Sequence, residues 1–129
     1  MEPEHEEAMR ADFAARTREY WKPLHRNTAL DQLAEIDSRV AEYDRRWQSG
    51  PYSEEWEFLR AAYADRRDYP EAMQHARTSI EASPDVFNEY GITELSQRSL
   101  IQARELDDER IAMTAKRLSQ RSNSIQRER

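Results

Sequence analysis

The chain has 129 residues, of which 36% are charged and 37% are hydrophobic, and its formal net charge at pH 7 is −6. This length is typical of one domain with a modest core, and the acidic balance argues against a general affinity for nucleic acid. Since the chain lacks cysteine, it has neither a disulfide nor a cysteine-based zinc site. Two glycines are too few for a glycine-rich phosphate loop, and β-branched runs are absent, so the composition predicts an all-α fold.

The first seven residues are acidic and lack the apolar core of a secretory signal, and no segment approaches 18 consecutive apolar residues. We therefore expect a cytoplasmic protein without membrane association. Only Lys22 and Lys116 of the 20 basic residues are lysines. We interpret this bias as that of a GC-rich bacterial genome, although arginine-rich interfaces leave the same trace.

The first predicted helix spans about residues 6–21, after about five frayed residues. It ends before Pro23, because proline disfavours helix in the residue ahead of it. The second predicted helix spans residues 29–48, and Ser49-Gly50-Pro51 stops it. Apolar residues follow the helical period in both segments: Met9, Phe13, Tyr20 and Trp21 in the first, and Leu33, Ile36, Val40, Tyr43 and Trp47 in the second.

The third and fourth predicted helices span residues 53–67 and 70–82. Glu54 and Glu55 place negative charge in the first turn of the third helix, where the helix dipole favours it. Pro70 opens the fourth helix, where its missing N–H costs little. The turn between the two helices is short, so we expect an antiparallel pair.

Six residues of this segment are spaced in a recognisable way: Trp56, Leu59, Tyr63, Ala72, Ala76 and Pro84. The spacing resembles a single tetratricopeptide repeat (TPR) over about residues 53–86, whose pattern is Trp-x2-Leu-Gly-x2-Tyr, Ala-x3-Phe and Pro. Two positions depart from it, since Arg60 replaces the glycine and Ala76 replaces the phenylalanine. The alternative is an ordinary antiparallel helix pair whose aromatic residues fill a core.

The resemblance implies a helix-turn-helix scaffold that binds other proteins. Shifting the pattern by 34 residues in either direction finds no second copy, although a stable repeat stack normally needs three. We therefore expect a compact stack of about five antiparallel helices, in which the TPR-like hairpin lies between an N-terminal helix pair and a long C-terminal helix.

A long helical pattern begins at about Ile92, after an irregularity at Gly91, and runs to about residue 121. We expect it to cap the stack, because a terminal repeat must cover its apolar face. In the alternative, part of its apolar stripe pairs with a second copy of the chain. The predicted organisation is one domain over residues 1–121 and a flexible basic tail over residues 122–129.

The resemblance and the side-chain chemistry favour a non-catalytic adaptor or chaperone-like protein that binds a peptide or a partner domain. Arginine and tyrosine are common at interaction hot spots. The candidate partner-binding residues are Arg60, Tyr63, Arg67, Tyr69 and Arg77, and an acidic peptide is the expected partner. Alternatively, arginines of this segment pair with neighbouring acids such as Asp65, Asp68, Glu71 and Glu81.

The second candidate function depends on the C-terminal segment, residues 110–129, which contains six basic residues and one acid. Here the chain would be a self-associating regulatory protein or a nucleic-acid accessory protein, with a homodimer formed through the C-terminal helix. The residues expected to contact an acidic partner or nucleic acid are Lys116, Arg117, Arg121, Arg127 and Arg129. Nucleic acid is the less favoured partner, because the tail has no aromatic residue for base stacking.

Catalytic motifs are not evident, so we expect a protein that is not an enzyme and that uses no cofactor. The histidines His5, His25 and His75 lie apart in the sequence. Glu71 and His75 share a helix face, yet a di-iron bundle needs a Glu-x-x-His motif on two helices. We therefore predict neither catalytic residues nor a metal site.

Overall fold

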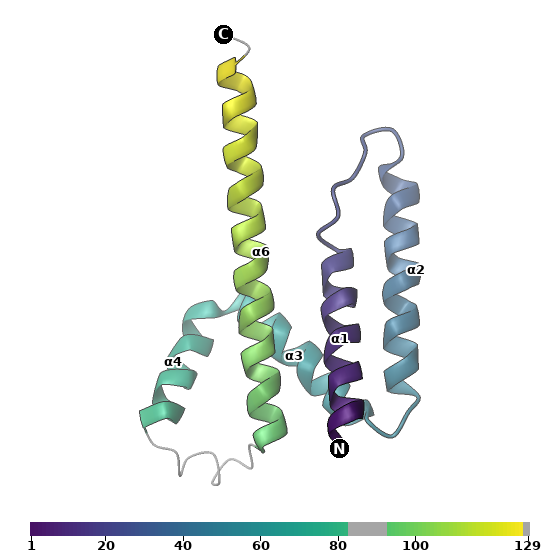
Figure 1. Cartoon of the computed structure of the whole chain (residues 1–129), viewed down its shortest axis with the longest axis vertical. Coiled ribbons are helices and arrows are strands. Elements are labelled where there is room, and N and C mark those ends of the chain that lie inside the picture. The colour runs from purple at the N-terminus through teal and green to yellow at the C-terminus, as the bar shows by residue number, and fades with distance from the viewer. Residues whose placement is uncertain (83–92, 128–129) are drawn as a thin grey trace.

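The structure is a computed structural model that describes residues 1–82 and 93–127, and these residues form five helices without a strand (Figure 1). The predicted all-α class is confirmed. The helices are α1 (Pro3–Glu19), α2 (Ala29–Gln48), α3 (Ser53–Asp68), α4 (Pro70–Ala82) and α6 (Glu94–Arg127). The bounds of α2 and α4 are those that the sequence predicts.

The N-terminal residues are helical almost from the start, although the sequence analysis expected them to be frayed. Pro3 occupies the first turn of α1, where its fixed φ suits a helix. A hydrogen bond of 3.0 Å joins the Nδ1 of His5 to the hydroxyl of Tyr52, the residue before α3, and so links this end of the chain to the start of α3. Helix α1 then ends at Glu19, two residues earlier than predicted.

The C-terminal helix α6 is 34 residues long and ends at Arg127, so residues 122–127 extend the helix where a tail was expected. At about 1.5 Å per residue it spans about 50 Å, and its last turns project beyond the other helices (Figure 1). Pro84 of the TPR-like spacing, the irregularity predicted at Gly91 and the helix start predicted at Ile92 lie outside the described residues, as does Arg129.

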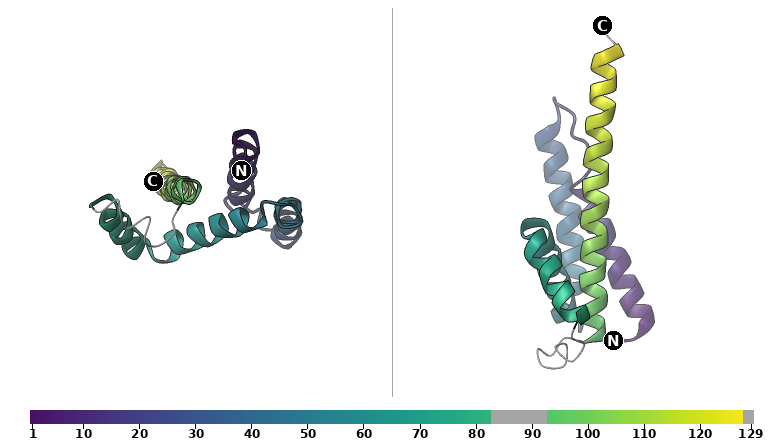
Figure 2. Two further views of the ribbon diagram at one scale, coloured as in Figure 1. Left: turned by 90° about the horizontal axis from the view of Figure 1, so that it is seen from below. Right: turned by 90° about the vertical axis from the view of Figure 1, so that its left-hand side faces the viewer.

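Helix α3 crosses the direction of the other helices. In Figure 2, α3 runs sideways from the end of α2 to the start of α4, while α2 and α6 are seen nearly end on. Helix α3 contacts α2, α4 and α6, and α1 contacts both α2 and α6. Helix α3 therefore joins the N-terminal helix pair to the C-terminal helix α6.

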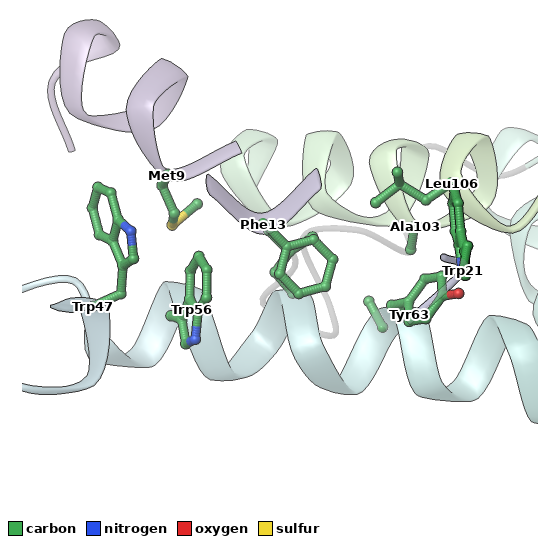
Figure 3. Close-up of a cluster of buried hydrophobic side chains, with 10 residues drawn as sticks. Met9, Phe13, Trp21, Trp47, Trp56, Tyr63, Ala103 and Leu106 are labelled. Atoms are coloured by element: carbon green, nitrogen blue, oxygen red, sulfur yellow. The ribbon is translucent and has the colours of Figure 1, made fainter. Parts of the chain in front are cut away.

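An aromatic cluster forms the core where α1, α2 and α3 meet (Figure 3). The ring of Phe13 contacts Trp56 edge to face, with centroids 5.5 Å apart, and Trp47 stacks on Trp56 at 5.9 Å. Phe13 also meets Tyr63 edge to face at 6.2 Å. These geometries suit the quadrupoles of aromatic rings and add to the hydrophobic stabilisation.

The predicted apolar faces agree in large part with the core. Met9, Phe13 and Trp21 are buried, as are Ile36, Val40 and Trp47. Two predicted core residues are corrected, because Tyr20 is 53% exposed and Leu33 is 43% exposed. Tyr20 lies just past the end of α1, where its ring contacts the guanidinium of Arg16 rather than the core.

The residues that resemble the TPR pattern pack differently from the expected antiparallel pair. Trp56, Leu59 and Tyr63 belong to the core cluster, together with residues of α1, α2 and α6. Ala72 and Ala76 on α4 are exposed, and α4 diverges from α3 after the turn (Figure 2). The cause lies in α3, whose apolar face is already occupied by the other helices. The family resemblance itself stays a prediction.

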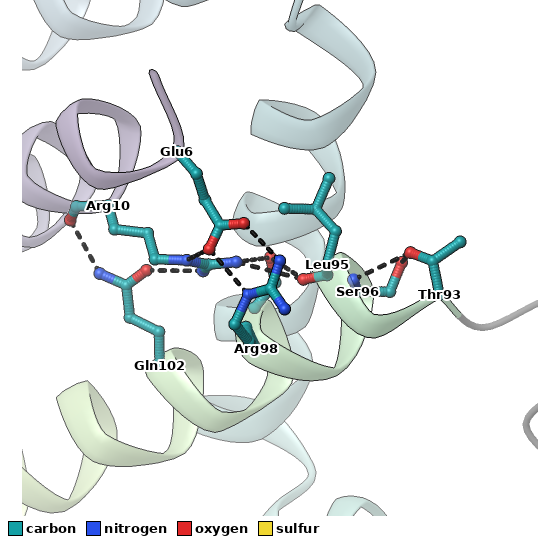
Figure 4. Close-up of polar contacts among 8 residues, drawn as sticks. Glu6, Arg10, Thr93, Leu95, Ser96, Arg98 and Gln102 are labelled. Atoms are coloured by element: carbon teal, nitrogen blue, oxygen red, sulfur yellow. Dashed lines mark hydrogen bonds and ion pairs between the residues drawn. The ribbon is translucent and has the colours of Figure 1, made fainter. Parts of the chain in front are cut away.

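A polar cluster joins α1 to the start of α6 (Figure 4). Arg10 donates to the side chains of Gln102 and Ser99 and to the carbonyl oxygen of Leu95, at 3.1 to 3.2 Å. The Nε of Arg98 donates to Glu6 at 2.8 Å. Hydrogen bonds from Arg98 and, more weakly, Arg10 lower the pKa of Glu6 to about 2, although burial opposes the shift.

Within residues 1–82 and 93–127, none of the helices combines the length and the apolar character needed to cross a membrane.

Candidate functional site: a hollow lined by arginine and aromatic side chains

A surface hollow of about 620 Å³ lies where α3 meets the end of α1 and the middle of α6. Its lining comes from three helices and the residues that follow α1: Arg16, Tyr20, Trp21, Glu57, Arg60, Ala61, Tyr63, Ala64, Arg67 and Arg110. The lining therefore contains four arginines, three aromatic residues and one acid. Planar cations beside aromatic rings suit a ligand that is both anionic and partly apolar.

Asp44 orients two of these arginines from behind the hollow. Its carboxylate accepts two hydrogen bonds from Arg16, through Nε at 2.8 Å and Nη2 at 3.4 Å. The Nε of Arg60 lies 3.9 Å from the same carboxylate, and its Nη1 donates to Glu57 at 3.0 Å. Both guanidinium groups are held in fixed directions, which reduces the entropy lost on binding.

The other two arginines have acids of their own. Arg67 pairs with Asp68 at 3.0 Å, and this hydrogen bond raises the pKa of Arg67. Arg110 pairs with Asp107 at 3.0 Å, and the side chain of Asp107 is only 3% exposed. The acids offset the positive charge, so any preference of the hollow for anions depends on directed N–H donors.

Each of the four arginines retains donor capacity. Within the described residues, Arg16 and Arg67 use Nε and Nη2 for their pairs and leave Nη1 without a protein partner. Arg110 likewise uses Nε and Nη2 and leaves Nη1. Arg60 uses Nε and Nη1 and leaves Nη2. A carboxylate accepts hydrogen bonds from such groups at several of its lone pairs.

Tyr63 forms part of the hollow's inner wall. Burial raises the pKa of its phenol, and this outweighs the opposing effects of Trp21 and Arg110. The phenol therefore stays neutral at physiological pH. The guanidinium of Arg67 lies 6.0 Å from the centre of the Tyr63 ring, at the distance of a cation–π contact.

The structure brings together three of the five residues that the sequence analysis named as partner-binding: Arg60, Tyr63 and Arg67. Tyr69 is 66% exposed and does not line the hollow. Arg77 pairs with Glu81 at 2.9 Å and lines a separate hollow between α4 and α6. The alternative of local ion pairs is thus also observed, for Arg67 with Asp68 and for Arg77 with Glu81.

Sequence reasoning missed Arg16, Tyr20, Trp21 and Arg110 as lining residues. The local signal for the first two was present, since an arginine and a tyrosine four residues apart share one helix face. Arg110 gave no such signal, because only the packing of α6 against α3 brings it to the hollow.

Of the five basic residues that the sequence analysis named in the C-terminal segment, the structure describes the side chains of Lys116, Arg117 and Arg121. Arg117 donates to the carbonyl oxygen of Trp21 at 2.6 Å, so it holds α6 against the end of α1. Lys116 and Arg121 are exposed on α6. For Arg127 the structure describes the helical backbone alone, and Arg129 lies outside the described residues.

Among the described residues, no group of three or more histidine, aspartate or glutamate side chains is placed to hold a metal ion. Glu71 and His75 lie with Gln74 on an open face of α4.

Comparison of the chain with protein-family models gives no match, and comparisons with curated proteins and with solved structures give none either. The resemblance to a TPR therefore rests on the spacing of residues within this chain, and functional inference rests on the hollow.

Proposed function

We propose that this protein is a non-catalytic protein–protein interaction module that binds an acidic peptide segment or chain terminus in the hollow between α1, α3 and α6. The observation that carries the proposal is the convergence of Arg16, Arg60, Arg67 and Arg110 around aromatic side chains. Interaction sites are rich in arginine and aromatic residues of this kind. The TPR-like spacing supports an adaptor or chaperone-like role.

The ligand chemistry follows from the lining. Glutamate or aspartate side chains would accept from the free terminal nitrogens, while an apolar or aromatic side chain would lie against Tyr20 and Trp21. Because the acids behind the arginines offset their charge, a purely electrostatic ligand gains little. A peptide that combines carboxylates with an apolar residue fits the hollow better.

The experiment compares capture of partners from the native cell by the unchanged protein and by two double variants. R60A/R67A removes two lining guanidinium groups whose side chains are partly or well exposed. R26A/R45A is the matched control, because it removes the same charge from exposed residues that do not line the hollow.

We expect partners that the unchanged protein and R26A/R45A recover to be lost or reduced at least tenfold with R60A/R67A. Equal recovery by all three proteins would contradict the proposal. A fluorescein-labelled peptide of glutamate and leucine, titrated by polarisation, provides the direct measurement. Its Kd should rise at least tenfold for R60A/R67A, which corresponds to about 1.4 kcal/mol.

The nucleic-acid alternative gains less support from the structure. Among the described side chains of the C-terminal segment, Arg117 already donates to the carbonyl oxygen of Trp21, which leaves Lys116 and Arg121 as exposed cations. Phosphate binding usually depends on several aligned cations. We therefore rank the peptide ahead of nucleic acid as the partner.

A further inference from the structure

Apart from Tyr63 in the inner wall, the residues of α3 that line the hollow follow one face of this helix. They are Glu57, Arg60, Ala61, Ala64 and Arg67. Residues three and four apart share a helix face, so the five positions form a continuous row. Glu57 and Arg67 are at its two ends, and at about 1.5 Å per residue these ends lie about 15 Å apart along the axis of α3.

The middle of this row allows a ligand to approach α3 closely. Ala61 and Ala64 carry only methyl groups there, whereas the residues at both ends carry long side chains. Arg16 leaves Nη1 and Arg60 leaves Nη2 without a partner among the described residues. These nitrogens are suited to donate to the carbonyl oxygens of a ligand main chain that passes over the two alanines.

The two ends of the row differ in charge. Glu57 is the one acid among the described residues that line the hollow. At the other end Arg67 is joined by Arg110 from α6, and Figure 2 shows α6 beside the half of α3 that leads to α4. Asp68 and Asp107, the acids that pair with these two arginines, do not line the hollow. A ligand therefore meets a carboxylate at one end and two guanidinium groups at the other.

Glu57 can accept a further hydrogen bond. Its Oε1 accepts from Nη1 of Arg60 at 3.0 Å and from Nε2 of Gln48 at 2.8 Å. Its Oε2 has no partner among residues 1–82 and 93–127, and the side chain is 53% exposed. A basic group of a ligand can bind Oε2 without breaking either bond, whereas a ligand carboxylate at this end is repelled.

The size of the hollow favours an extended ligand over a helical one. A helix about 15 Å long and about 10 Å in diameter occupies about 1,200 Å³, as calculated for a cylinder. The hollow holds about 620 Å³. In an extended segment, side chains four residues apart point to the same side and lie about 13 Å apart. This separation is close to that between the two ends of the row.

We propose that the hollow binds an extended peptide segment in which a basic residue and an acidic residue are four positions apart. The basic side chain binds Glu57, and the carboxylate binds Arg67 and Arg110. An apolar residue between them lies against Tyr20 and Trp21. The inference rests on the proposed function and adds that Glu57 selects the ligand, so a segment with both charges binds more tightly than a uniformly acidic one.

Titration of the full-length protein with short labelled peptides tests the selection at low ionic strength. The first peptide is Lys-Ala-Leu-Ala-Glu with blocked termini, and the second carries glutamate in place of lysine. Both are also made in reversed order, because the spacing does not fix the direction of the main chain. We expect the better lysine peptide to bind about threefold or more tightly than its glutamate counterpart, since an attraction replaces a repulsion at an exposed site.

Variants of Glu57 connect this preference to one side chain. E57K should reverse the order of the two peptides, and E57Q, which retains an acceptor oxygen, should bind them equally. E54K is the matched control, because Glu54 is exposed on the same helix and does not line the hollow, and it should retain the preference of the unchanged protein.

The outcomes separate this inference from the proposed function. Peptide binding that weakens in R60A/R67A but shows no preference for lysine, or a preference that E57K leaves unchanged, would overturn the selection by Glu57 and retain the hollow as a binding site. A lysine peptide with two positions between its charges in place of three should bind more weakly, and equal binding would overturn the extended arrangement. Absence of binding by every peptide would overturn both proposals.

Discussion

Asp44 accepts a hydrogen bond of 3.0 Å from the indole N–H of Trp56, and this bond joins the C-terminal part of α2 to the first turn of α3. The same carboxylate oxygen accepts from Arg16 on α1 at 2.8 Å. One acid thus connects three helices, with a residue of the core on one side and a residue of the hollow on the other. This carboxylate therefore contributes to the stability of the core and also orients an arginine that lines the hollow.

Replacement of Asp44 tests this connection. In D44A the partly buried Arg16 loses its counter-charge and Trp56 loses its acceptor, so we expect a loss of about 2–4 kcal/mol in the free energy of unfolding. D37A on the same helix is the control, since Asp37 is exposed, and it should change the free energy by less than about 0.5 kcal/mol. Urea titration followed by circular dichroism measures both. A similar small loss in the two variants would show that Asp44 does not tie the helices together.

The aromatic core makes a second prediction. Trp56 is fully buried against Phe13 and Trp47, so W56A should destabilise the protein by about 3–5 kcal/mol through lost burial and a cavity. Phe58 is 38% exposed on the same helix, and F58A should cost about 1 kcal/mol or less. Thermal unfolding of the two variants side by side checks the difference. The reverse order would place the core on the other face of α3.

The sequence predicted the helices better than their arrangement. Helix bounds depend on local signals, and Pro70 and Gly50 fixed two of them through the backbone preferences of these residues. The direction of α3 depends on which distant side chains pack on Trp56 and Tyr63. Nothing near these residues in the sequence reveals that Phe13 packs on them, so the local pattern predicts an antiparallel pair of α3 with its neighbour α4.

In the candidate site, too, local features could be predicted from the sequence and long-range contacts could not. Arg60, Tyr63 and Arg67 share one face of α3 because they are three and four residues apart, and this face was predictable. Arg16 and Arg110 reach the hollow through contacts that span 28 residues to Asp44 and the packing of α6 on α3. Such long-range placement has no local pattern, and for that reason half of the arginines in the site were missed.

The ion pair between Glu6 and Arg98 predicts how stability depends on pH. The pKa of Glu6 is about 2 in the folded protein and about 4.5 ordinarily, so its contribution is complete above pH 4.5 and is lost as the pH falls toward 2. With discounting for the half-exposed Arg98, we expect this contribution to be on the order of 1–2 kcal/mol.

Urea unfolding at pH 7 and at pH 3 measures the effect on the unchanged protein and on E6Q. The difference in the free energy of unfolding between E6Q and the unchanged protein should be smaller at pH 3 than at pH 7. E7Q is the control, because Glu7 is exposed and makes no ion pair among the described residues. A gap that stays constant between the two pH values would rule out titration of Glu6 as its source.

Replacement of Arg67 and replacement of Arg110 should have different effects on the free energy of unfolding. Arg67 pairs with an exposed acid, so R67A should lower the free energy of unfolding by less than about 1 kcal/mol. Arg110 neutralises Asp107, whose side chain is 3% exposed, so R110A leaves a buried carboxylate unpaired and should cost about 3–5 kcal/mol.

The double variant R110A/D107A separates this cost from lost packing. If the unpaired carboxylate is the cause, removal of both partners should recover much of the stability that R110A alone loses, because a missing pair is less costly than a buried unpaired charge. Urea unfolding of R67A, R110A and the double variant gives the comparison. Were the double variant no more stable than R110A, the packing of the Arg110 stem against the hollow would explain the loss, and Asp107 would have no part in holding this wall of the site.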